Sequence, residues 1–152
     1  MEKVLEGLLL INGQDVYTTY GAYLTELKAG DHANYNELLK PPAMKPYTAV
    51  AYREQDGEAL PDVLPIPRFE ARDITLYFAL TAETKTDWFA KYTAFITLLK
   101  SGWLNIEVPE LNKTYKMYYK DCTNYEQLTY LKEEAVYASR FKLKFREPKP
   151  GI

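Results

Sequence analysis

Residues 133–148, EEAVYASRFKLKFREP, form the clearest structural element in this chain of 152 residues. Apolar and basic residues alternate along it, and this period of two is typical of a β-strand with one buried and one solvated face. The predicted buried face carries Ala135, Tyr137, Phe141, Leu143 and Phe145. The predicted solvated face carries the basic row, Arg140, Lys142, Lys144 and Arg146.

One main helix is predicted over about residues 86–101, within the stretch TDWFAKYTAFITLLKSG. Its apolar residues recur at spacings of four, three and four, which places them in one stripe along a helix. These residues are Trp88, Tyr92, Phe95 and Leu99. Thr84 or Thr86 is a suitable N-cap. We expect the stripe to form the core between this helix and a sheet.

An N-terminal β-hairpin is predicted within LLLINGQDVYTTYGAYL, residues 8–24. Asn12-Gly13 favours a type I′ turn, because both central residues of that turn need a positive φ. The paired strands are expected at residues 4–11 and 14–17, with another extended piece at residues 21–24. The Asn-Gly pair is thus interpreted as a turn and not as a chemical site.

The middle of the chain is irregular in its sequence pattern. A helical turn is predicted at residues 35–39, ended by Pro41-Pro42, since proline cannot continue a helix. Residues 48–52 are predicted as a strand, and residues 60–67, with three prolines, as an extended connector. Strand 68–80, RFEARDITLYFAL, changes the parity of its apolar residues, which predicts a bulge near Arg72-Asp73.

Further strands are expected at residues 103–108 and 115–121, with a less regular continuation to 128. Strands therefore dominate and one helix lies between them. The predicted class is α+β: an antiparallel β-sandwich or barrel with the helix packed against it and the hairpin at the N-terminus. The length fits a single domain, residues 1–147, followed by a loose tail at residues 148–152.

Composition excludes several functions. A hydrophobic content of 47% and a charged content of 26% are ordinary for a globular protein, and a net charge of −2 argues against nucleic-acid binding as the main task. Cys122 is the lone cysteine, so no internal disulfide is expected. Neither a signal peptide nor a membrane-spanning run is found, which predicts synthesis in a reducing cytoplasm.

The residues needed for catalysis are scarce. One histidine, His32, and two serines, Ser101 and Ser139, give no pattern typical of a nucleophile beside its base. Metal-ligand spacings and phosphate-binding glycine loops are also missing from the sequence. No catalytic residue, metal or cofactor is therefore predicted.

The basic row allows two interpretations. Neighbours on one face of a strand lie about 7 Å apart, a spacing at which the row can contact phosphates or an acidic partner. Alternatively, the row is a solvated face paired with acids on neighbouring strands, which is the usual arrangement in sheets with one wet face. The second interpretation is favoured.

The order of these elements resembles a known family. An "ING-D" start leads into "YG-YL", an "R–ITL-F-L" strand precedes the helix, and a "G-L-I-VPE-N-TYK-YY" unit follows it. This pattern is similar to the tail-tube-like fold of phage tail proteins, most closely the N-terminal domain of distal tail proteins. The resemblance covers nearly the whole chain but includes no catalytic signature.

The resemblance implies a structural protein of a phage or prophage tail, a distal tail or tube-end ring protein, made in the bacterial cytoplasm and located in the virion tail. A tube protein, a tube-end terminator or another ring component uses the same fold, so these positions in the tail stay open. It implies a homo-oligomeric ring, hexameric in the family, with other tail or baseplate proteins as partners, and neither membrane nor sequence-specific nucleic acid. The hairpin 8–17 and the irregular segment 29–47 are the candidate arms that contact other subunits. Their candidate contact residues are Leu10, Ile11, Asn12, Gly13, Tyr35, Leu38, Pro41 and Pro42.

Many distal tail proteins carry a second domain, and this sequence ends just after its last predicted strand, so direct recognition of the host surface is not expected.

Two alternatives to an assembly module stay open. A chain with 14 Tyr, 6 Phe and 2 Trp can instead be a soluble binding module for a peptide or sugar. An enzyme of unrecognised type is the third hypothesis.

Overall fold

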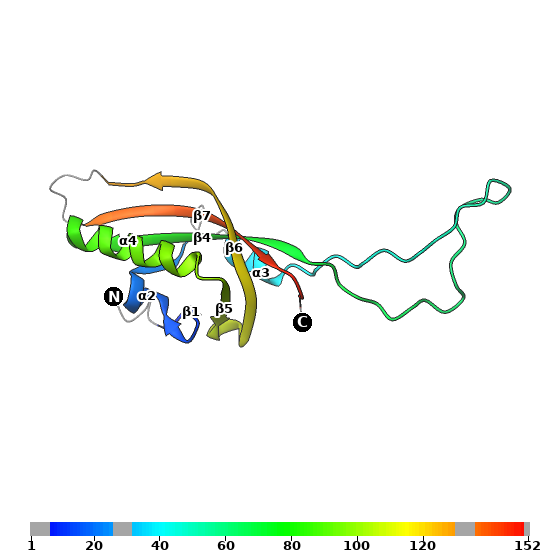
Figure 1. The fold of residues 1–152 in the computed structure, drawn as a ribbon, viewed down its shortest axis with the longest axis horizontal. Helices are drawn as coiled ribbons and strands as arrows, with labels where there is room; N and C mark the ends of the chain where they lie inside the picture. Colours follow the sequence, from blue (N-terminus) through cyan, green and yellow to red (C-terminus); the bar gives the residue numbers. More distant parts are fainter. Residues whose placement is uncertain (1–6, 26–31, 130–135, 151–152) are drawn as a thin grey trace.

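The chain forms one antiparallel sheet with a long helix against it (Figure 1). This computed structural model describes residues 7–25, 32–129 and 136–150. Within those residues seven strands pair in the order β2-β1-β5-β6-β7-β4-β3. The predicted class, α+β with an antiparallel β architecture and one main helix, is confirmed.

The centre of the sheet is the pair β4 (Arg72–Ala82) and β7 (Tyr137–Glu147). Their eleven residue pairs run from Arg72↔Glu147 to Ala82↔Tyr137 without a register shift. Along β7 buried and half-buried residues alternate over its whole length, as the sequence pattern predicts. Predicted strand residues 133–135 lie outside the described part of the chain.

The predicted bulge near Arg72-Asp73 is wrong. The pairing of β4 is continuous from Arg72 onward, and Phe69 lies before the strand, in an isolated bridge with Met44. The parity of the apolar residues changes at residues 70–71, because the isolated bridge of Phe69 lies before them and strand β4 begins after them. The apolar pattern alone does not distinguish the two and predicts a single strand.

A corner is made by β6 (Lys113–Gln127), which follows β5 (Trp103–Val108) through a short 3-10 turn, Pro109–Leu111. Its first part, up to Tyr118, pairs with β5, and from Tyr118 onward it pairs with β7. Two register shifts lie in this second part, between Tyr119 and Asp121 and between Cys122 and Asn124. Such irregularities bend a strand and increase its twist, which lets β6 join the two halves of the sheet.

The long helix α4 (Lys85–Leu99) matches the predicted helix to within about two residues at each end. Thr84 is the N-cap, and its Oγ1 accepts a 3.0 Å hydrogen bond from the backbone N–H of Asp87. Trp88, Phe95 and Leu99 are buried, whereas Tyr92 is half-buried. The stripe packs on the central strands, with Phe95 in ring contact with Phe78 and Phe141.

The N-terminal hairpin is shorter than predicted. Its strands are β1 (Leu10–Ile11) and β2 (Gln14–Asp15), joined at Asn12 (φ 53°) and Gly13 (φ 83°). Tyr17, predicted in the second strand, lies instead in a helical turn, α2 (Val16–Tyr20), before β3 (Ala22–Leu24). Val16 is fully buried, so core packing outweighs the strand preference of this stretch. Residues 4–6 of the predicted first strand lie outside the described residues.

The irregular middle of the chain begins with α3 (Ala33–Leu39), a longer helix than the single turn predicted at residues 35–39. The predicted strand at residues 48–52 is not formed. Only one isolated bridge, Val50↔Ala59, lies in this segment. A strand needs a hydrogen-bonded neighbour along its length, and the described residues supply one only at Val50.

Replacing Trp88 by Ala is expected to lower the free energy of unfolding by about 3–5 kcal/mol, because a buried aromatic side chain leaves a cavity. The matched control is Phe89→Ala, since Phe89 is its exposed neighbour and the change is expected to cost well under half as much. Denaturant unfolding followed by circular dichroism measures both. Equal stability of wild type and Trp88→Ala contradicts the packing described for α4.

Candidate assembly surfaces

The feature that most departs from a compact domain is the arm, residues 41–71. It leaves the body after α3 and returns at the start of β4, reaching far beyond the sheet (Figure 1). Only the bridges Met44↔Phe69 and Val50↔Ala59 link its two limbs. Six of the nine prolines of the chain lie in it: Pro41, Pro42, Pro46, Pro61, Pro65 and Pro67. Proline stiffens an extended chain but blocks regular pairing, which explains an arm without a sheet of its own.

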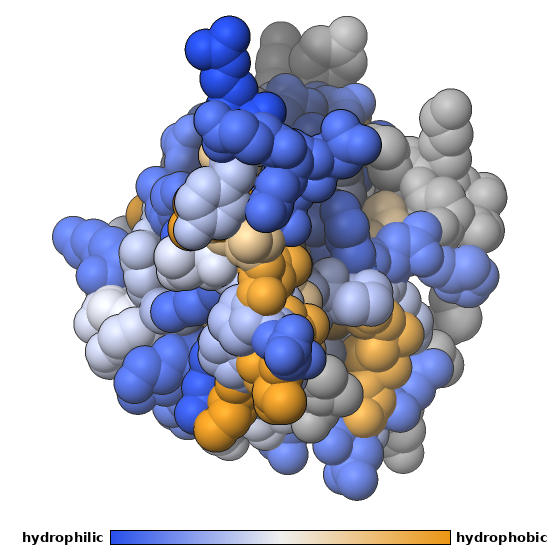
Figure 2. Space-filling view, turned by 90° about the vertical axis from the view of Figure 1, so that its right-hand side faces the viewer, coloured by the Kyte–Doolittle hydropathy of each residue, from blue (hydrophilic) through white to orange (hydrophobic). Residues whose placement is uncertain are grey.

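Large apolar side chains are exposed along the arm. Val63 is 84% exposed and Ile66 is 73% exposed. The others are Met44, Val50, Tyr52, Leu60 and Leu64. Figure 2 faces the end of the molecule from which the arm extends and shows hydrophobic residues gathered in strips among hydrophilic ones. Grouped exposure of this kind is typical of a surface that a partner covers.

The base of the arm is held by Arg72. Its Nε lies 2.7 Å from Glu147 Oε1, and both side chains are largely buried. Its Nη1 donates to the carbonyl of Lys40 at 2.5 Å and its Nη2 to that of Leu38 at 3.4 Å. One guanidinium thus ties the point where the chain leaves the body to the strand on which it returns. Tyr115 adds a hydrogen bond of 3.3 Å to the Leu38 carbonyl.

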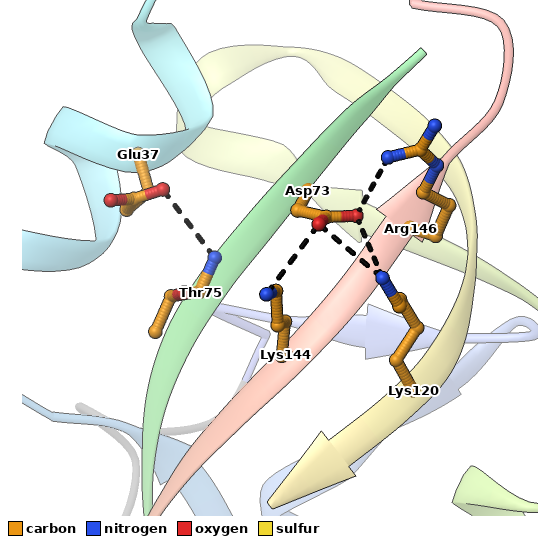
Figure 3. Close-up of polar contacts among 6 residues, drawn as sticks. All are labelled: Glu37, Asp73, Thr75, Lys120, Lys144 and Arg146. Atoms are coloured by element: carbon orange, nitrogen blue, oxygen red, sulfur yellow. Dashed lines mark hydrogen bonds and ion pairs between the residues drawn. The ribbon is translucent and has the colours of Figure 1, made fainter. Parts of the chain in front are cut away.

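The outer edge of β4 is closed by side chains of α3. Asn34, which is buried, accepts a 2.7 Å hydrogen bond from the backbone N–H of Tyr77 and donates to the Tyr77 carbonyl at 3.2 Å. It also donates to the carbonyl of Thr25 at 2.8 Å. The Glu37 carboxylate accepts from the N–H of Thr75 at 3.4 Å (Figure 3). These side chains replace a neighbouring strand, because they bond the N–H and C=O of Tyr77 and the N–H of Thr75.

Asp73 forms a cluster with three cations at the start of β4 (Figure 3). Its carboxylate lies 3.0 Å from Arg146, 3.3 Å from Lys120 and 3.5 Å from Lys144. Burial opposes ionisation of this carboxyl, but hydrogen bonds from Arg146 and Lys120 and their charges outweigh it, so the pKa of Asp73 is lowered. The cluster links β4, β7 and β6 on the solvated face of the sheet.

The basic row therefore has contacts within its own chain. Arg146 and Lys144 contact Asp73, and Arg140 lies 3.7 Å from Glu126 on β6. Lys142 stands over the ring of Tyr77, 5.9 Å from its centroid. This is the arrangement of a solvated face paired with acids on neighbouring strands.

In the structure, some of the predicted contact residues are buried in the core of the chain and others are exposed. Ile11 is fully buried and Leu38 is 2% exposed, so both belong to the core of this chain and are not available to another subunit. Leu10 is half-buried in β1. The exposed turn of Asn12 and Gly13 is fixed to the sheet, because Asn12 exchanges 2.9 Å hydrogen bonds with the backbone of Asn105. The hairpin is thus not a free arm.

Tyr35, Pro41 and Pro42 lie where the arm begins. Tyr35 donates to the Glu110 carboxylate, and burial together with that hydrogen bond raises the pKa of Tyr35 to about 12. Pro41 is exposed and Pro42 is half-buried. The predicted contact residues include none from residues 43–71, which form most of the arm, although four prolines among unpaired apolar residues are a pattern that points to this segment.

The polar residues considered for catalysis are scattered. His32 precedes the first turn of α3, Ser101 donates to the Leu98 carbonyl after α4, and Ser139 is buried in β7. The described residues contain no group of three or more His, Cys, Asp or Glu placed to hold a metal ion. Among the described helices, none combines the length and the apolar character needed to cross a bilayer.

Comparison with solved structures gives the class of this fold: it is the fold of a phage distal tail protein, a component of the tail hub, as the sequence resemblance implies. The matching structure is the SPP1 Dit (gp 19.1) protein, described as a paradigm of the hub adsorption apparatus in phages that infect Gram-positive bacteria. The TM-score is 0.52 at 14% sequence identity, over 94% of this chain and 52% of that one. This chain thus spans about half the length of the SPP1 protein. No family model matches the sequence, and no curated protein does.

Replacing Glu147 by Ala is expected to lower the free energy of unfolding by about 3–5 kcal/mol, because the buried guanidinium of Arg72 loses its counter-ion. Glu107→Ala on the exposed face of β5 is the control and is expected to change it by less than about 0.5 kcal/mol. Urea unfolding of the two variants gives the comparison. Equal effects would show that the clamp at the base of the arm contributes nothing.

Replacing Asp73 by Asn is expected to cost about 1 kcal/mol at neutral pH, as for a partly exposed ion-pair network. The folded-state pKa of Asp73 is lowered, so its stabilisation is present above the unfolded-state pKa and is lost as pH falls through the folded value. The difference between wild type and variant should therefore shrink below about pH 4. Unfolding curves measured from pH 7 to pH 2.5 test this, with Asp62→Asn on the arm as control. A difference that stays constant across this range contradicts the assignment.

Proposed function

We propose that this protein is a structural component of the distal end of a phage or prophage tail and acts by assembling into a ring. The observation that carries the proposal is the arm, whose exposed apolar side chains find no cover on the body of their own chain. The shared fold with a tail hub protein supports the same conclusion. No catalytic step and no cofactor enter this function.

In the proposed ring each copy offers its arm to the next copy around the axis. An arm that extends from one end of the molecule makes a head-to-tail contact, and repeated contacts of this kind close into a ring when the rotation between copies allows it. The resemblance suggests six copies. Other tail or baseplate proteins would bind above and below the ring, and the protein would reside in the virion tail after synthesis in the host cytoplasm.

One observation favours the alternative of a small-ligand binding module. A cavity of about 210 Å³ lies between β3 and α3, with Tyr17, Tyr23 and Tyr35 among its lining residues. Binding sites for drug-sized ligands usually measure about 300–1,000 Å³. The cavity is below that range, so assembly is the stronger proposal.

Light scattering on a sizing column, over a concentration series, tests ring formation directly. A closed species several times the mass of the 152-residue chain, seen as rings by electron microscopy, supports the proposal. A monomer at all concentrations up to the millimolar range would overturn self-assembly as its function. Retention of a free peptide or sugar by such a monomer would then favour the binding module.

Replacing residues 43–69 by a short Gly-Ser linker is expected to leave the fold intact and to abolish assembly. The base of the arm is already closed, since Arg72 contacts the carbonyl of Lys40, so a short linker can span it. Thermal unfolding should change by only a few degrees, while the mass in solution falls to that of a monomer. Assembly that persists without these residues would show that the arm is not the contact.

A further inference from the structure

Residues 48–52 of the arm form a strand-prone segment without a partner. The sequence Thr-Ala-Val-Ala-Tyr alternates larger residues, Thr48, Val50 and Tyr52, with alanines, and such residues favour β-strands. Val50 and Tyr52 are about half exposed, at 48% and 52%. The segment is extended, yet its pairing is limited to the bridge with Ala59. Residues 48–52 thus have the sequence pattern of a strand but no second strand with which to pair.

The backbone of this segment has one free side. Val50 donates to the carbonyl of Ala59 at 3.1 Å and accepts from its N–H at 2.7 Å, so Val50 faces the other limb of the arm. Backbone groups alternate in direction along an extended chain. The N–H and C=O groups of Ala49 and Ala51 therefore face away from that limb.

The second half of β6 has a free edge. Strand β5 pairs with β6 only up to Tyr118, and beyond it the described residues place β7 on one side of β6 and no strand on the other. The register is regular from Asn124 to Gln127, after the two shifts. Leu128 donates to the carbonyl of Ala138 in the β7 direction at 3.0 Å, so Tyr125 and Gln127 direct their backbone groups outward.

The two elements match in length, charge and apolar character. Five residues, 48–52, extend over about 17 Å, which equals the span of residues 124–128. The arm segment carries no charge, so it meets no repulsion from Glu126 or Lys120. Tyr125 is 42% exposed at this edge. Val50 and Tyr52 share one face of an extended segment, so together they can cover Tyr125 on the corresponding face of the sheet.

The two elements lie at opposite ends of the molecule. In Figure 1 the arm extends to the right of the body, whereas the end of β6 lies on the left. One chain cannot bring them together without unfolding its base. On β4, the side that faces away from β7 pairs with the short strand β3 and, beyond it, is covered by Asn34 at Tyr77 and by Glu37 at Thr75. The geometry leaves a second copy of this chain as the partner that carries both complementary elements.

We infer that residues 48–52 of one copy add as a strand to the outer edge of β6, residues 124–128, in the next copy. This contact rests on the proposed ring function and identifies its interface. Backbone hydrogen bonds from Ala49 and Ala51 give the affinity, and the side chains of Val50 and Tyr52 bury the apolar surface at the edge.

The decisive test compares two substitutions at one position. Ala49→Pro removes an outward N–H and keeps the segment extended, whereas Ala49→Val keeps the N–H and adds a side chain that favours strands. Light scattering across a concentration series should show the midpoint of assembly raised at least about tenfold by Ala49→Pro and unchanged or lowered by Ala49→Val. Ala49 is outside the core, and far-ultraviolet circular dichroism checks that each variant is folded.

Hydrogen exchange gives an independent readout on the unmodified chain. The amides of Ala49, Ala51, Tyr125 and Gln127 should exchange rapidly in the diluted monomer and slowly in the assembled form. An assembly in which Ala49→Pro changes nothing and these amides stay unprotected overturns the strand-addition contact and leaves ring formation standing. Wild-type protein that never assembles overturns both the ring and this contact.

Discussion

The structure depends on one buried ion pair, Arg72 with Glu147. Arg72 begins β4 and Glu147 ends β7, so the pair fixes the first register position of the central strand pair. The same guanidinium binds the carbonyls of Lys40 and Leu38, which close the base of the arm. A buried charge pair is costly to desolvate, and it is tolerated here because two backbone carbonyls, those of Lys40 and Leu38, accept further hydrogen bonds from the guanidinium. The compact body and the extended arm meet at this one side chain.

From the sequence, much of the body was predictable and most of the arm was not. Periodicity located β7 and α4, because the alternation around Phe141 and the stripe from Trp88 to Leu99 reflect burial on one face of a long element. It failed at Tyr17, where tertiary packing of Val16 selects a helical turn. It also failed at Ile11 and Leu38, since a local pattern does not tell whether an apolar residue points into its own core or to a partner. The wrong strand at residues 48–52 has the opposite cause: the local preference is present, and the neighbouring strand is missing from the single chain.

The solvated face of the body differs from the first limb of the arm, residues 41–52, in its charge. On the solvated face, Asp73 and Glu126 pair with Arg140, Lys144 and Arg146 of the basic row, so three of its four cations have an acidic partner within one copy. On the arm, the exposed residues are mainly apolar and proline, with few charges between Pro41 and Tyr52. Proline restricts the free arm to extended conformations, so less conformational entropy is lost when a partner orders it.

The closed edge of β4 has a consequence for the polymer that the copies form. Asn34 and Glu37 bond the N–H and C=O of Tyr77 and the N–H of Thr75, so this part of β4 does not pair with a further strand there. In the proposed contact each copy has a valence of two: one arm that is donated and one β6 edge that accepts the arm of the next copy. A monomer with two unlike ends grows only into an unbranched chain or a closed cycle. A copy that has lost either end would terminate that chain, and a small proportion of such copies would limit the yield of complete cycles.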